Sequence, residues 1–91
     1  MRLKDKVCAI TGAGSGIGAA AARIFAREGA RVALLEVNAE TGRQVADEIG
    51  DAAIFIETDV SDAAAVAAAF EQISTDFGRL DGLYNNASVF W

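Results

Sequence analysis

The sequence contains no histidine, no proline and a single cysteine, Cys8. Zinc sites are built mainly from cysteine and histidine ligands, so no metal site of that kind is expected. One cysteine cannot close an intramolecular disulfide. Because Cys8 lies in an apolar run, we expect a buried strand residue rather than a reactive thiol.

Long apolar runs and excess positive charge are also lacking. No run approaches the roughly 20 residues of a membrane-spanning helix, and the first residues have neither the apolar core nor the cleavage site of a signal peptide. The net charge of −5 argues against nucleic acid or an anionic membrane as a partner. Without an export signal or a disulfide framework, a cytoplasmic location is expected.

The composition is that of a small globular domain, with 53% hydrophobic and 23% charged residues among 91. We expect one domain over residues 1–91, in which apolar segments of strand length alternate with amphipathic segments of helix length. Strands are predicted at 6–11, 31–36 and 52–57 and from residue 80, with helices from the glycine-rich stretch to about Gly29, from Asn38 to Gly50 and from Ser61 to Gly78. In the first helix, the spacing predicts an inner face of Ile17, Ala21, Ile24 and Phe25.

This alternation predicts an α/β fold with parallel strands joined by right-handed crossovers. The expected arrangement is a partial Rossmann-type, doubly wound sheet of strand order 3-2-1-4 with helices on both faces. The fourth strand would then form an open parallel edge. Such an edge predicts self-association or a missing C-terminal half.

Four glycines lie between Gly12 and Gly18, where the first strand turns into the first helix. Exposed backbone N–H groups and a helix N-terminus together form a seat for a pyrophosphate. The strand order reverses beside this turn, which opens the crevice where such sheets bind ligands. The alternative is a turn that only packs helix on strand. The T-G-x-x-x-G-x-G spacing favours the ligand.

Glu36 ends the second predicted strand, where a carboxylate can accept hydrogen bonds from an adenosine ribose. A ribose 2′-phosphate at 4 Å would be repelled by about 4 kcal/mol at an effective dielectric of about 20. Neither Ser15 nor Val37 supplies a compensating cation. The charge therefore predicts NAD in preference to NADP.

Two later stretches agree with a dinucleotide. Asp59 can accept a hydrogen bond from an adenine amino group while Val60 lies against the ring, although Asp59 and Ser61 are equally suited to be turn and capping residues. Asn85 and Asn86 follow an apolar strand, where buried amides are costly unless satisfied. We expect these amides to tie neighbouring loops together beside the cofactor.

Together, the stretches TGAGSGIG, DV and NNAS resemble the cofactor, adenine and N-N-A-G motifs of the short-chain dehydrogenase/reductase family, in the same order. The resemblance implies that Asn85 stabilises the central sheet and that the other site residues hold the cofactor. The cofactor-binding set is Gly12, Ser15, Gly16, Ile17, Gly18, Glu36, Asp59, Val60, Asn86 and Ala87.

The family's catalytic asparagine, serine and Y-x-x-x-K pair follow the N-N-A-G motif and have no counterpart in these 91 residues. Tyr84 has no lysine four positions on, and Ser88 stands where the family usually has glycine. The resemblance therefore implies the NAD-binding half of an enzyme that transfers hydride between NAD and a secondary alcohol or ketone. By itself the chain is not expected to be catalytic.

Two other functions remain open. A short, non-catalytic protein could bind a nucleotide or pair with a relative through the open strand edge. An S-adenosylmethionine-dependent methyltransferase also has a glycine-rich first turn and acidic residues after its second and third strands, but Thr11–Gly12, the glycine spacing and the NNA stretch do not fit it.

Overall fold

The computed structural model describes residues 3–14, 16–85 and 88–90, the last three by their backbone alone. Strands and helices alternate along the chain as far as β4, as the apolar pattern predicts. In chain order the elements are β1 (Val7–Thr11), α1 (Gly16–Arg27), β2 (Arg31–Glu36), α2 (Ala39–Ile49), β3 (Ala53–Glu57), α3 (Ala63–Phe77), β4 (Gly82–Asn85) and β5 (Ser88–Phe90).

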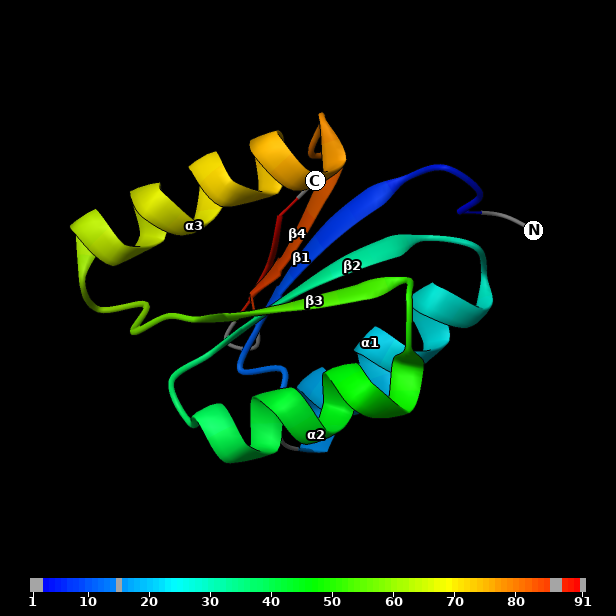
Figure 1. Cartoon of the computed structure of the whole chain (residues 1–91), viewed down its shortest axis with the longest axis horizontal. Helices are drawn as coiled ribbons and strands as arrows, with labels where there is room; N and C mark the ends of the chain where they lie inside the picture. The colour runs from blue at the N-terminus through cyan, green and yellow to red at the C-terminus, as the bar shows by residue number, and fades with distance from the viewer. Residues whose placement is uncertain (1–2, 15, 86–87, 91) are drawn as a thin grey trace.

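The strands form one sheet in the order β3-β2-β1-β4-β5. β1 lies between β2 and β4 and is parallel to both, with Ile10 opposite Leu34 on one side and Tyr84 on the other. The predicted order 3-2-1-4 is confirmed. As Figure 1 shows, α1 and α2 cover one face of the sheet and α3 covers the other, so the predicted layers are confirmed as well.

The expected open edge at β4 is wrong. β5 pairs with β4 in antiparallel register, with Asn85 opposite Ser88. Only two residues separate the strands, and so short a connection joins antiparallel neighbours, whereas a parallel neighbour needs a crossover of about a dozen residues or more. β5 therefore covers the β4 edge and forms the edge of the sheet itself, while self-association and a missing C-terminal half both stay predictions.

Alternate residues of the central strands divide the core between the two faces. Cys8, Ile10, Val32 and Leu34 pack with the helices α1 and α2. The intervening residues pack with Ala69 and Ile73 of α3 in a second cluster, made on the strands by Val7, Ala9, Ala33, Leu35 and Ile56. A strand with both faces covered reads as a continuous apolar run, which is the pattern of β1 and β2.

The inner face predicted for α1 is wrong in part. Ile17 and Ile24 are 69% and 51% exposed, and the helix buries Gly18 and three alanines instead. Small residues occupy this face because α1 lies close against the turn that precedes it. Phe25 does pack on the core, with its ring 6.2 Å from that of Tyr84 in an edge-to-face arrangement.

The helix caps follow the sequence, with one exception. Asn38 caps α2, and its side-chain oxygen accepts hydrogen bonds from the backbone of Glu40 and Thr41. Asp62, not the predicted Ser61, caps α3. The hydroxyl of Ser61 is engaged by Asp59 instead, 2.6 Å away.

Two further expectations concern Cys8 and the absence of a membrane-spanning helix. Cys8 is buried, as predicted, and its burial raises the pKa of the thiol, with the charge of Asp81 adding to the effect. No helix in the described part of the chain is long and apolar enough to cross a membrane.

Candidate functional site

The glycine-rich turn lies at the carboxyl end of β1, in the centre of the sheet. The amide of Gly12 donates a hydrogen bond to the carbonyl of Leu35, 2.9 Å away, which joins the turn to β2. Gly12 and Gly16 have φ angles of 62° and 49°. That left-handed region favours glycine, so both residues are required by the path of the backbone.

Gly16 and Gly18 face different surroundings. A Cβ atom added to Gly18 would meet the backbone of Gly12 and lie 3.2 Å from the Cα of Ala13, so this glycine lets α1 pack directly on the turn. A Cβ atom added to Gly16 would meet nothing within 4 Å. The turn therefore presents open space at the first residue of α1, where the helix N-terminus favours an anion.

Glu36 ends β2 and is only 9% exposed. One carboxylate oxygen accepts a hydrogen bond from the amide of Gly14, and the other accepts one from the amide of Asn38, both at 2.9 Å. The side chain thus connects the glycine-rich turn to the residue that caps α2. A carboxylate has about four acceptor positions, so it retains acceptor capacity beyond these two bonds.

Sequence reasoning did not include Gly14 among the site residues. A Cβ atom at Gly14 would meet the hydroxyl oxygen of Thr41 and lie 2.9 Å from both Cγ and Oε1 of Glu36. Its φ angle lies outside the left-handed region, so Gly14 is needed for space and not for conformation. The only signal in the sequence was a glycine at a variable position of the motif. Its partner Glu36 lies 22 residues further along the chain, so no local pattern shows the contact.

Asp59 and Val60 lie on the loop after β3, and both are exposed, Val60 by 54%. The Asp59 carboxylate accepts hydrogen bonds from the hydroxyl and the amide of Ser61, at 2.6 and 2.9 Å. These two hydrogen bonds lower the pKa of Asp59, the hydroxyl having the larger effect. The loop is thus closed by a local Asx turn.

Asn85 ends β4 beside the end of β1. Its side-chain oxygen accepts a hydrogen bond from the hydroxyl of Thr11, 3.3 Å away. This contact links the two strands that border the crevice. Three predicted site residues, Ser15, Asn86 and Ala87, lie outside the described residues.

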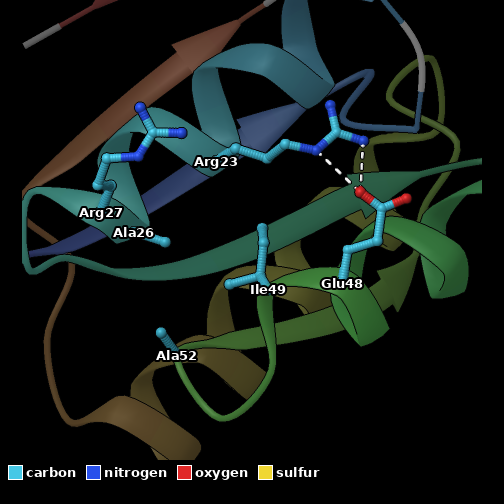
Figure 2. A pocket seen from close by; sticks show the side chains of 6 residues that line it. All are labelled: Arg23, Ala26, Arg27, Glu48, Ile49 and Ala52. Carbon is cyan, nitrogen blue, oxygen red and sulfur yellow. Dashed lines mark hydrogen bonds and ion pairs between the residues drawn. The ribbon is translucent and has the colours of Figure 1, made fainter.

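Two hollows lie apart from this turn. The larger, of about 350 Å³, is lined by residues toward the C-terminal ends of α1 and α2 and by Ala52. Figure 2 shows Arg23 and Glu48 pointing toward each other beside it, with an N···O distance of 2.8 Å. The smaller, of about 240 Å³, is lined by Leu3, Lys6, Cys8 and Asp81. Neither includes a residue of the glycine-rich turn.

Comparisons with known proteins show the family of the chain. The model of the short chain dehydrogenase family matches residues 6–91. The chain belongs to this family. It is 44% identical over 90 residues to sorbitol dehydrogenase from Cereibacter sphaeroides and 45% identical over 91 residues to D-threitol dehydrogenase from Mycolicibacterium smegmatis.

A solved structure of a family member shares the fold as well. The 3-ketoacyl-(acyl-carrier-protein) reductase from Brucella melitensis, crystallised with NADH, is 44% identical with a TM-score of 0.87, and the match covers 89% of this chain and 34% of that one. The match to sorbitol dehydrogenase covers 99% of this chain and 35% of that protein, and the match to D-threitol dehydrogenase covers 97% and 35%. The chain thus spans about a third of the length of these relatives.

Proposed function

We propose that this chain is the dinucleotide-binding part of an NAD-dependent short-chain dehydrogenase. The observation that carries the proposal is the open space at Gly16, because left-handed glycines and a helix N-terminus meet there at the crevice of the sheet. The donor set fits a pyrophosphate, since backbone N–H groups and a helix dipole favour an anion. The solved relative that was crystallised with NADH supports the choice of a nicotinamide dinucleotide.

The preference for NAD over NADP rests on Glu36. Its carboxylate lies at the end of β2, and its hydrogen-bond partners are uncharged backbone amides. A ribose 2′-phosphate placed there would meet a negative charge, because the ion pairs among the described residues do not involve Glu36. Val37, the next residue, is 61% exposed and brings no positive charge.

The residues of this chain would bind and orient the cofactor. The pyrophosphate would be surrounded by Gly12, Ser15, Gly16, Ile17 and Gly18. Glu36 would accept hydrogen bonds from the adenosine ribose. The adenine would be bordered by Asp59 and Val60. Asn86 and Ala87 would contact the cofactor through the backbone. When bound, a nicotinamide exchanges hydride with the carbon of a secondary alcohol or ketone. We assign no catalytic residue to this chain, and the cytoplasmic location stays a prediction.

The test is equilibrium binding of NADH, NADPH and S-adenosylmethionine to the protein and to its Gly16→Asn variant. Asparagine tolerates the left-handed backbone, so the variant is expected to keep its urea midpoint while its side chain enters the open space. We expect NADH to bind more tightly than NADPH, and the variant to lose at least tenfold in NADH affinity. Unchanged NADH binding by the variant, or binding of S-adenosylmethionine alone, would contradict the proposal.

A further inference from the structure

The further inference concerns the pair Gly14 and Glu36, and it rests on the proposed cofactor site. Acidic side chains at strand ends ordinarily point into solvent, where the charge is hydrated. Glu36 is instead 9% exposed, and each of its carboxylate oxygens accepts a hydrogen bond from a backbone amide of another segment. A buried carboxylate needs such partners, because an unpaired buried charge is costly.

Gly14 supplies the space that this arrangement needs. Any side chain at position 14 would place its Cβ atom 2.9 Å from Cγ and Oε1 of Glu36, a distance that requires one of them to move. The backbone at Gly14 does not itself require glycine, because its φ angle is not positive. Glycine is therefore needed at position 14 because the side chains of Glu36 and Thr41 occupy the space that a Cβ atom would take.

We propose that Gly14 and Glu36 form one positioning unit, in which the carboxylate holds the glycine-rich turn to the start of α2 before any cofactor binds. The amide of Gly14 belongs to the turn and that of Asn38 to the cap of α2, so one side chain sets the relative position of two segments. Glu36 then affects dinucleotide binding in two ways. Its negative charge disfavours a ribose that carries a 2′-phosphate, and its length lets it hydrogen-bond to both segments and hold the turn in place.

Two substitutions separate the effect of the Glu36 charge from the effect of its side-chain length. Glu36→Asp keeps the negative charge but is one methylene shorter, so it no longer spans to both amides. Glu36→Gln keeps the length and one acceptor oxygen but loses the charge. The matched controls are Glu57→Asp and Glu57→Gln, because Glu57 lies opposite Glu36 on β3 and is exposed.

The first readout is amide hydrogen exchange without cofactor. Glu36→Asp is expected to speed exchange at Gly14 and Asn38 at least tenfold, and Glu57→Asp to leave both amides unchanged. With NADH and NADPH, Glu36→Asp is expected to weaken both several-fold at an unchanged ratio, and Glu36→Gln to shrink the ratio at least tenfold. Equal exchange in Glu36→Asp and the unsubstituted protein would overturn the inference.

The second readout is a double-mutant cycle of Gly14→Ala and Glu36→Asp. Contacting residues give non-additive effects, so the shift of the urea midpoint in the double variant should be smaller than the sum of the single shifts. Additive shifts would overturn the coupling. The hydrogen exchange and the double-mutant cycle are both measured without cofactor. Failure of NADH to bind would therefore contradict the proposed function, while these two measurements would still decide the positioning unit.

Discussion

The ends of β2 and β3 carry acidic residues that look alike in the sequence and differ in the structure. Glu36 is buried and accepts hydrogen bonds from residues 22 and 2 positions away. Asp59 is exposed and accepts hydrogen bonds from the hydroxyl and the amide of Ser61, two positions away. The first carboxylate joins separate segments, and the second shapes only its own loop.

The position of each strand in the sheet accounts for the difference. β2 lies between β1 and β3, so its end is flanked by the turn after β1 and by the start of α2. β3 is an edge strand, and the loop after it leads away to α3 on the other face, as Figure 1 shows. A carboxylate in the interior therefore gains partners from neighbouring segments, whereas one at the edge has mainly water and its own backbone.

The largest effect is expected at Gly18, where α1 packs directly on the glycine-rich turn. Gly18→Ala places a methyl group against the backbone of Gly12, which cannot rotate away. Overpacking costs about 1–3 kcal/mol, and we expect about 3 kcal/mol for a contact with rigid backbone, of which the gain in helix propensity offsets about 1 kcal/mol. We expect urea unfolding to show a loss of about 2 kcal/mol, with weaker NADH binding.

Gly42→Ala is the matched control for this prediction. It adds the same methyl group within α2, but the atoms that it meets belong to the ring of Phe55. A side chain at the outer strand can shift more readily than a backbone carbonyl, so a smaller loss of stability is expected. A loss at Gly42 equal to that at Gly18 would show that backbone contact is not what makes the glycine-rich turn special.

A second prediction tests the two carboxylates directly. Glu36→Ala leaves the amides of Gly14 and Asn38 without their acceptor, and a buried donor left unsatisfied costs about 1–3 kcal/mol. Asp59→Ala removes hydrogen bonds whose donors can turn to water, so its urea midpoint should change less. Equal shifts in the two variants would mean that the buried contacts of Glu36 contribute nothing beyond a local loop.

Much of the fold follows from local patterns in the sequence. The apolar runs of β1 and β2 predict buried parallel strands, and Asn38 predicts the start of α2, because strand burial and capping depend on residues near in the chain. The inner face of α1 was missed in part because alanine carries a weak apolar signal. Its close packing depends on Gly18 meeting Gly12, which periodicity does not register.

The candidate site was predictable to a similar extent. The motif spacing placed Gly12, Gly16 and Gly18 at one turn, and the strand end placed Glu36 beside it. What the sequence did not predict is the contact between Gly14 and Glu36, because a partner 22 residues away has no local pattern. The antiparallel β5 was missed for another reason, since the family resemblance favoured a parallel neighbour for β4.

The smallest expected effect concerns the stability that Asp59, on the exposed loop after β3, loses at low pH. Hydrogen bonds from Ser61, first from its hydroxyl and then from its amide, lower the pKa of Asp59 below the ordinary value of 3.8. An aspartate with a lowered pKa in the folded state contributes stability that is fully present above its unfolded pKa. That contribution is lost as the pH falls through the lower, folded value.

Ser61→Ala removes the hydroxyl donor and leaves the amide donor, so the pKa of Asp59 should rise toward 3.8 without reaching it. A carbon-13 carboxyl NMR titration of the protein and the variant measures this shift. Stability at neutral pH should change little, since Asp59 is exposed and remains ionised there. If amide hydrogen exchange at Gly14 or Asn38 changed as well in Ser61→Ala, the loop after β3 would be coupled to the contacts of Glu36, and the contrast between the two strand ends would not hold.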